Sequence, residues 1–207
     1  MLKNADSREC RLPKCKVVFF ATGNLNKFNE ARSILGQYGI AVGMLKLKGD
    51  EVQSDRLQEI AEKSVKNAYE TCHLPIFVED AGLFINVLNG FPGPYAAYVY
   101  KTIHNDGVLK LMEKEKNRKA VFQSVIAFCS KETPTPVCFF GESNGEITQT
   151  QRIEAGKSGF GFDPIFQPDG TSKTFAEMTI TEKNRYSHRA NAISKFAEWY
   201  KTKYAKI

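Results

Sequence analysis

The sequence lacks any apolar run that could cross a bilayer, and it lacks internal repeats and low-complexity segments. A membrane-spanning helix needs about 20 consecutive apolar residues, whereas the longest apolar stretches here, residues 16–21 and 121–129, have the length of strands. Residues 1–14 carry early charges with no apolar stretch behind them, which argues against a secretory signal. We therefore expect a cytoplasmic protein without membrane contact, with a flexible tail at 1–14 and a single domain at 15–207.

Cysteine and histidine are too few and too poorly spaced for the common structural sites. Five cysteines and three histidines occur, and no two cysteines have C-x-x-C spacing. An odd count without an export signal argues against structural disulfides, and a zinc site on Cys10 and Cys15 would need two more ligands. Cys129 and Cys138 lie in apolar, strand-like runs, where we expect small core residues.

What the 207 residues do contain is typical of a globular protein that buries its own core. Hydrophobic residues make up 42% and charged residues 25% of the chain. The formal net charge of +6 suits a polyanionic partner, either a nucleic acid or a nucleoside triphosphate. Charge alone leaves a third interpretation open, because many basic proteins are merely soluble.

Strand-like and helix-like segments alternate along the chain, which favours an α/β or α+β domain. We expect strands at residues 16–21, 40–47, 75–79, 121–129, 137–140 and 146–151, with an extended segment at 82–88. Apolar residues at helical spacing predict helices at 26–38, 55–72, 95–103, 107–114 and 187–204. Ser187 can cap the last helix by accepting a backbone N–H.

The first candidate for chemistry is the turn between the first strand and the first helix, Thr22-Gly23-Asn24 followed by Lys27. Glycine lets the backbone turn tightly and approach a ligand. A helix N-terminus offers free N–H groups and a partial positive charge to phosphate. The spacing is not that of a P-loop, and a simple strand–helix turn with a surface lysine explains the pattern equally well.

Three acidic residues form a second candidate, which suits a hard divalent cation. Glu79 and Asp80 end an apolar strand, and Glu51 ends the second strand region. Mg²⁺ usually takes one or two carboxylates together with phosphate oxygens and water. Because adjacent strand residues point to opposite faces, only one of Glu79 and Asp80 is expected to face a cleft. The alternative for this pair is a solvated turn.

A third candidate is the segment in which glycine separates aromatic rings, Phe160-Gly161-Phe162-Asp163. Two rings can hold a planar base by stacking, whereas the alternative is a hairpin with buried phenylalanines.

The fourth candidate is the start of the last helix, with Lys183, Ser187, His188 and Arg189. The helix dipole disfavours cations there, so an anionic or acceptor-rich partner is expected.

In this order and spacing, the segments resemble the inosine triphosphate pyrophosphatase family, in particular its archaeal and bacterial (d)ITP/XTP pyrophosphatases. The likeness runs from about residue 16 to residue 201 and rests on Thr22-Gly23-Asn24-x-x-Lys27, Glu79-Asp80-Ala81-Gly82-Leu83, Gly90-Phe91-Pro92-Gly93-Pro94-Tyr95, Gly159-Phe160-Gly161-Phe162-Asp163-Pro164 and Ser187-His188-Arg189. The resemblance implies an elongated mixed sheet flanked by helices, with two lobes and an active-site cleft between them. It also implies a homodimer that needs Mg²⁺ and hydrolyses ITP, dITP and XTP to the monophosphate and pyrophosphate.

The resemblance further implies roles for single residues. The residues that would hold the triphosphate are Thr22, Gly23, Asn24, Lys27 and Lys63. Those that would bind the metal or activate water are Glu51, Asp80 and Glu79. Those around the base and its phosphates are Phe160, Gly161, Phe162, Asp163, Lys183, Ser187, His188 and Arg189. The alternatives are a nucleic-acid-binding module and a related pyrophosphatase that acts on other modified nucleotides. The acidic residues argue against the first, because they would repel the phosphate backbone of a nucleic acid.

Overall fold

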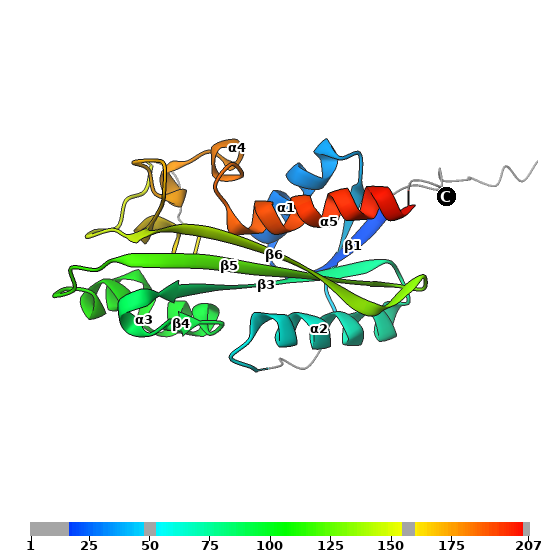
Figure 1. Cartoon of the computed structure of the whole chain (residues 1–207), viewed down its shortest axis with the longest axis horizontal. Helices are drawn as coiled ribbons and strands as arrows, with labels where there is room; N and C mark the ends of the chain where they lie inside the picture. The colour runs from blue at the N-terminus through cyan, green and yellow to red at the C-terminus, as the bar shows by residue number, and fades with distance from the viewer. Residues whose placement is uncertain (1–16, 48–52, 155–159, 205–207) are drawn as a thin grey trace, which may run out of the picture.

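The computed structural model describes residues 17–47, 53–154 and 160–204, which form one seven-stranded sheet with helices on both faces (Figure 1). The predicted tail, Cys10, Cys15 and Glu51 lie outside these ranges. In chain order the elements are β1 (Val17–Ala21), α1 (Leu25–Gln37), β2 (Ala41–Leu45), α2 (Leu57–Cys72), β3 (Ile76–Ile85), η1 (Asn86–Leu88), β4 (Pro92–Gly93), α3 (Ala96–Leu111), β5 (Lys119–Ser130), β6 (Thr133–Ile147), η2 (Asp163–Ile165), β7 (Phe166–Pro168), η3 (Phe175–Glu177), α4 (Ile180–Lys183) and α5 (His188–Tyr204).

The sheet is mixed, with the order β2-β1-β3-β5-β6-β7, and β4 pairs with β3. Strand β1 runs parallel to β2 and β3, whereas the pairs β3–β5, β5–β6 and β6–β7 are antiparallel. The long strands β3, β5 and β6 extend through the length of the molecule (Figure 1). The mixed α/β fold expected from the sequence is confirmed.

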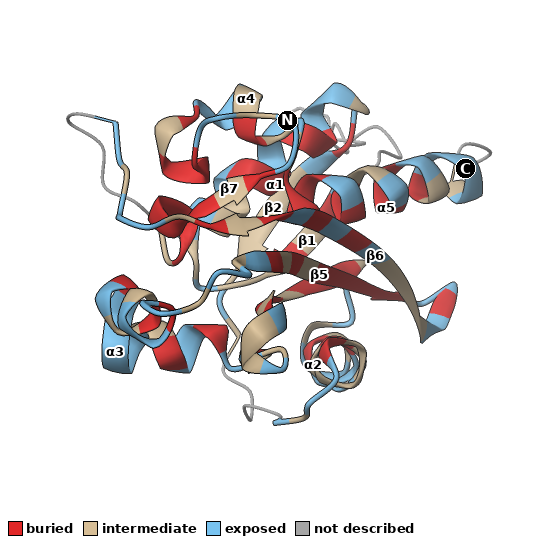
Figure 2. Cartoon of the chain, turned by 60° about the vertical axis from the view of Figure 1, so that its left-hand side comes forward, coloured by how far each residue is buried: buried red, intermediate tan, exposed pale blue. Residues whose placement is uncertain are grey.

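Helices α1 and α5 cover one face of the sheet, and α2 and α3 cover the other (Figure 1). Under α1 and α5, the ring of Phe20 stacks on Phe77 at 4.4 Å between centroids, and Phe77 packs against Phe196 of α5. Buried residues form stripes along β5, β6 and the side of α5 that faces them (Figure 2). This aromatic packing holds the middle of α5 against the sheet.

Two further apolar clusters complete the core. The cluster under α2 includes Val65 and Val78, together with Cys129, which is fully buried as predicted. The other cluster lies at the α3 end and joins Val108 of α3 to Phe122 of β5. Because these two clusters are separate, the molecule has an α2 half and an α3 half. No helix of the described ranges has the length and apolarity needed to cross a bilayer.

Two predicted boundaries were wrong. The third strand does not stop at Asp80, because β3 continues to Ile85 through pairs with β4 and β5. The two helices predicted at 95–103 and 107–114 are confirmed as the two parts of α3, which meet at a kink where His104, with a φ of 54° and a ψ of −168°, is not helical. Strand β6 ends at Ile147, so residues 148–151 do not extend the sheet.

Candidate active site

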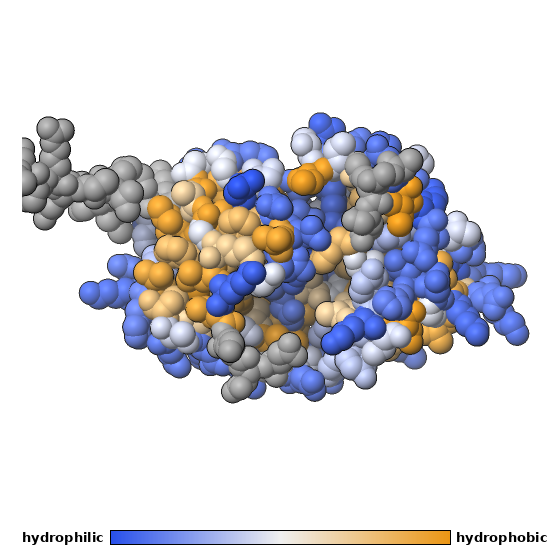
Figure 3. All heavy atoms as spheres, turned by 180° about the vertical axis from the view of Figure 1, so that it is seen from behind, coloured by the Kyte–Doolittle hydropathy of each residue, from blue (hydrophilic) through white to orange (hydrophobic). Residues whose placement is uncertain are grey.

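A cleft of about 850 Å³ lies on the α2 face, between α2 and the beginning of α3. Its floor includes Thr22 and Gly23 after β1 and Asp80 on β3, and Tyr98 lines its α3 wall. The hydroxyl of Tyr95 donates to a carboxylate oxygen of Asp55 at 3.1 Å, which joins the α3 wall to the approach of α2. Seen from behind, the surface is hollowed between the two halves of the molecule (Figure 3). The predicted cleft therefore exists between the α2 half and the α3 half.

The turn after β1 is built as a helix cap. Oδ1 of Asn24 accepts the N–H groups of Asn26 and Lys27, and the N–H of Asn24 donates to Oγ1 of Thr22. The sequence predicted free N–H groups at this helix end, but two of them are already satisfied by Asn24. What the turn presents to the cleft is Thr22 and Gly23. Lys63 lies on the exposed surface of α2 and neighbours Ile60, a cleft residue, one helical turn away.

Asp80 is the acidic residue that faces the cleft. Its Oδ2 is buried and has no hydrogen-bond partner among the described residues. Burial raises the pKa of Asp80 to about 6, with Lys27 opposing and Glu79 reinforcing the rise. Asp80 is therefore mostly ionised at neutral pH but more basic than an ordinary aspartate, which suits a group that exchanges protons.

Glu79 points to the opposite face of β3, as the alternation of strand side chains requires. Its side chain is fully buried, and Oε1 accepts from Oγ of Ser124 at 2.8 Å and from Nε of Arg189 at 3.0 Å. Oε2 lies 2.8 Å from Nζ of Lys27. Burial disfavours the charged form, but Arg189 and Lys27 outweigh it and hold the pKa of Glu79 far below its ordinary value. This placement does not fit the predicted alternative in which Glu79 activates water, because its carboxylate is turned away from the cleft and already paired.

Glu79 belongs to a buried ion-pair network that crosses from β3 to α1, α4 and α5. Glu30 on α1 accepts from Nζ of Lys183 at 2.8 Å and pairs with Nη1 of Arg189, and Asp163 accepts from Lys183 at 2.6 Å. The members are three cations and three carboxylates, Lys27, Lys183, Arg189, Glu30, Glu79 and Asp163. Their charges balance, which is what allows so many ionised groups to be buried together.

The charges in this network shift the pKa values of its members. Burial opposes ionisation of Glu30, yet Arg189 and Lys183 lower its pKa to about 2. Burial also opposes the charged form of Lys183, but Asp163 and Glu30 raise its pKa. For Asp163, burial outweighs Lys183 and raises the pKa. The carboxylates also raise the pKa of Arg189, so the network keeps Lys183 and Arg189 charged although both are buried.

Lys183 and Arg189 were predicted to face the base or its phosphates. In the structure both residues are almost completely buried and form ion pairs with Glu30, Glu79 and Asp163. Nε and Nη1 of Arg189 are both engaged by carboxylates, and its role toward the base or its phosphates stays a prediction. The ammonium of Lys183 has three donors, of which two are used here.

His188 and Ser187 also lie inside the protein. The His188 ring stacks on Phe122 at 4.6 Å, and burial followed by the charge of Arg189 lowers its pKa well below the usual range. The ring is therefore neutral at physiological pH, and its Nδ1 has no partner among the described residues. Ser187 is fully buried, and its Oγ accepts from the N–H of Ala190 at 3.4 Å, which confirms the predicted cap.

The two phenylalanines of the aromatic segment have different environments. Phe160 is half-buried, with Nζ of Lys183 6.0 Å from its ring centroid. Phe162 is only 4% exposed and sets its ring edge-on to Tyr100 at 5.6 Å. The Phe162 ring is thus packed in the core, and the role of the two rings beside a base stays a prediction.

Glu30 is the functional-site residue that the sequence interpretation missed. It lies one helical turn before Ile34 and next to Ala31, so it shares the buried side of α1 with apolar residues. A carboxylate at a core position of an amphipathic helix needs a buried cationic partner. The core position of Glu30 in α1 could have revealed its role. It was overlooked because glutamate is also common on the exposed faces of helices.

Within the described residues, no group of three or more histidine, cysteine, aspartate or glutamate side chains could hold a metal ion by itself. Asp80 is the one carboxylate among the described residues that line the cleft, and its unpartnered Oδ2 fits a hard cation. The second predicted metal ligand, Glu51, lies outside the described ranges. The described part of the site thus fits a cation that keeps phosphate oxygens and water among its ligands.

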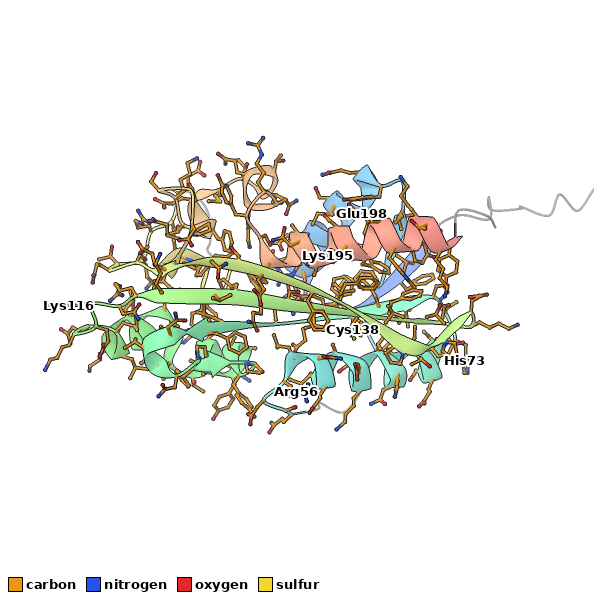
Figure 4. The ribbon with its side chains drawn as sticks, in the orientation of Figure 1. Arg56, His73, Lys116, Cys138, Lys195 and Glu198 are labelled. Atoms are coloured by element: carbon orange, nitrogen blue, oxygen red, sulfur yellow. The ribbon has the colours of Figure 1, made fainter. Side chains whose placement is uncertain are left out.

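Arg118, in the connection between α3 and β5, has a structural role. Its guanidinium donates to the carbonyls of Met112, Ile147 and Thr148 at 2.6–2.8 Å and so ties three parts of the chain together. Lys116, in the same connection, lies at the extreme end of the molecule, far from Arg56 at the start of α2 (Figure 4).

Comparison with known proteins was consistent across sequence and structure. The model of the Ham1 family matches residues 18–199. A dITP/XTP pyrophosphatase of Methanopyrus kandleri is 51% identical over 188 residues, which are 91% of this chain and 98% of the relative. A dITP/XTP pyrophosphatase of Thermococcus kodakarensis is 48% identical over 182 residues, 88% of this chain and 96% of the relative. The structure of a HAM1 protein from Coxiella burnetii superposes with a TM-score of 0.77 at 26% identity, covering 91% of this chain and all of that chain.

Proposed function

This chain belongs to the Ham1 family, and from that premise we propose that it hydrolyses the deaminated purine nucleotides ITP, dITP and XTP to the monophosphate and pyrophosphate. The observation that carries the proposal is the buried, unpartnered carboxylate oxygen of Asp80, in the cleft that also contains Thr22 and Gly23. A proton acceptor beside a backbone turn suited to phosphate is what hydrolysis of a phosphoanhydride needs.

In the proposed reaction, the oxygen of a water molecule bonds to the α-phosphorus while one of its protons passes to Asp80. The bond from the α-phosphorus to the bridging oxygen then breaks, and pyrophosphate leaves with the bonding electrons. With a pKa of about 6, Asp80 is mostly ionised at neutral pH and still basic enough to accept the proton. Lys27 lies beside this strand and would use its remaining donor on the departing phosphates.

We propose Mg²⁺ as the cofactor, with Asp80 and Glu51 as its protein ligands. When bound, such a cation neutralises phosphate charge and lowers the pKa of water. The support from the described residues is Asp80, since a single carboxylate supplemented by phosphate oxygens and water is a usual Mg²⁺ environment. Thr22, Gly23 and Lys63 are proposed to hold the phosphates at the two walls of the cleft.

We propose that the base is selected on the opposite side of β3, where Phe160 stands beside Lys183. Hypoxanthine and xanthine carry a 6-keto oxygen, which can accept the third donor of Lys183 or a donor of the neutral His188 ring. Adenine carries a 6-amino group there, and each donor left unpaired in a buried site costs about 1–3 kcal/mol. Stacking on Phe160 adds affinity for any purine without distinguishing among them.

The test is pyrophosphate release from ITP, XTP, dITP, ATP and GTP, each with Mg²⁺ and with EDTA. We expect fast release from the first three with Mg²⁺, little from ATP and GTP, and none with EDTA. Equal release from all five would retain the chemistry and refute the account of base selection. Release from none of them would refute the proposed function.

Assembly, compartment and domain extent are proposed on family membership alone. We propose a homodimer in the cytoplasm, where nucleoside triphosphates are made and used, with residues 15–207 as the single catalytic domain. Sedimentation equilibrium tests the dimer, and a monomeric species at micromolar concentration would exclude it.

A further inference from the structure

The interruption of α3 at His104 places a buried amide against the aromatic segment. Asn105, the next residue, is only 4% exposed. Its Nδ2 donates to the carbonyl of Gly161 at 3.2 Å and to Oε1 of Gln151 at 3.1 Å. The break in the helix therefore coincides with the turn of Asn105 toward the segment that carries Phe160.

Gly161 is the point at which this segment changes direction. Its φ of +55° is a conformation that side chains other than glycine rarely adopt, although a Cβ there would meet nothing within 4 Å. The backbone at Gly161 is thus fixed by its conformation rather than by crowding, and the Asn105 amide holds the carbonyl of that residue. Fixing this carbonyl fixes the residues on either side of it.

Those flanking residues reach the base side of the proposed site. The N–H of Asp163 donates to the carbonyl of Phe160 at 3.0 Å, which closes a tight turn around Gly161. Oδ2 of Asp163 then binds Lys183 at 2.6 Å. A contact made by α3 is in this way transmitted to both Phe160 and Lys183.

A second hydrogen bond ties the same part of α3 to the chain on the other side. Nε2 of Gln151 donates to Oδ1 of Asp106 at 2.6 Å, while its Oε1 accepts from Asn105. Neighbouring residues of α3 therefore hold both Gln151 and Gly161. Oδ1 of Asn105 is buried and has no partner among the described residues, a cost that an apolar side chain would avoid. Packing alone does not explain an asparagine at this position.

We propose that Asn105 is a positioning residue for base recognition, which acts through the Gly161 carbonyl to set Phe160 and the Asp163–Lys183 pair. This inference rests on the proposed function. Asn105 itself does not line the cleft that contains Asp80, as far as the described residues define it. Its loss should therefore disturb binding and choice of the base more than the chemical step.

The decisive variant is Asn105→Asp, which keeps the shape of the side chain but, when ionised, can no longer donate. The matched control is Asn117→Asp, an exposed asparagine whose Oδ1 accepts the N–H of Lys119, a role that aspartate keeps. We expect the KM for ITP to rise about tenfold in Asn105→Asp, from loss of a buried hydrogen bond, with kcat within about twofold. The preference for ITP over ATP in kcat/KM should narrow, and Asn117→Asp should match the wild type.

Gln151→Ala covers the case in which Asn105→Asp does not fold, because Gln151 is exposed and its truncation removes only one partner of Asn105. It should raise the KM for ITP in the same direction by a smaller factor. Unchanged KM and unchanged ITP preference in the folded variants would overturn the inference, as would a loss confined to kcat.

Failure of the proposed function is a separate outcome. It appears in the wild type, as absence of pyrophosphate release from all the nucleotides. In that event the ratio of variant to wild-type Kd for ITP, measured by calorimetry, replaces the ratio of KM values. A Kd ratio near one would then overturn the role of Asn105 as well.

Discussion

Glu30→Gln should cost the protein a large part of its stability, because Glu30 joins Lys183 to Arg189 inside the buried ion-pair network. The pKa of Glu30 is lowered from 4.5 to about 2. At about 1.4 kcal/mol per pKa unit, this corresponds to about 3 kcal/mol in favour of the folded, ionised state. Removal of one partner of a buried ion pair typically costs about 3–5 kcal/mol, which agrees in size.

The assay is urea denaturation at pH 7, followed by circular dichroism. The control is Glu70→Gln, an exposed glutamate on α2 whose loss should change the free energy of unfolding by less than about 0.5 kcal/mol. If Glu30→Gln behaves like this control, the network does not contribute to stability in the way its geometry indicates.

The same variant makes a signed prediction for pH. The pKa of Glu30 is depressed in the folded protein, so its stabilising contribution is complete above pH 4.5 and is lost as the pH falls toward 2. The difference in unfolding free energy between wild type and Glu30→Gln should therefore shrink across that window. A difference that grows as the pH falls would contradict the assignment.

Asp80→Asn should abolish pyrophosphate release while the melting temperature stays within a few degrees of wild type, since Oδ2 has no partner to lose; activity near the wild-type level would remove Asp80 from the chemistry. Phe162→Ala should lower the free energy of unfolding by about 3–5 kcal/mol, because the ring is core; a neutral result would mean that Phe162 is free to leave the core. Gly141→Ala should destabilise by about 1–3 kcal/mol, since its Cβ would fall 2.0 Å from the carbonyl of His188, whereas Gly36→Ala meets nothing within 4 Å and should be neutral or stabilising. Equal melting temperatures for the two glycine variants would contradict that contrast.

Local patterns in the sequence predicted the parts of the fold that depend on neighbours along the chain. The turn after β1, the apolar face of α2 and the Ser187 cap are set by residues close to one another, and all three are present. The family resemblance added the expectation of a mixed sheet and a cleft, and the matching relatives confirm the resemblance. The alternation of side chains along β3 also predicted correctly that only one of Glu79 and Asp80 would face the cleft.

What the sequence could not predict depends on contacts between distant segments. Arg189 of α5 and Glu79 of β3 are 110 residues apart in the chain and meet between the helix and the sheet, so the sequence showed two charged residues but not that each neutralises the other. The same limit applies to Phe162, because its partner Tyr100 lies on α3 and no local pattern distinguishes a ring that stacks on a base from a core ring. The helix break at His104, by contrast, lies between the helices predicted at 95–103 and 107–114, because the helical spacing of apolar residues is interrupted there.

Two adjacent carboxylates on strand β3, Asp80 and Glu79, lie on opposite faces of the sheet and have different surroundings. Asp80 faces the cleft, and Glu79 faces the cations that anchor α1 and α5. A shift of one residue in the pairing of β3 with β5 would exchange the two faces. In a misaligned molecule Glu79 would face the cleft in place of Asp80. Lys27 and Arg189 would at the same time lose the carboxylate that neutralises them. Catalytic turnover thereby becomes a readout of correct strand alignment, since a population with slipped strands loses activity and stability together.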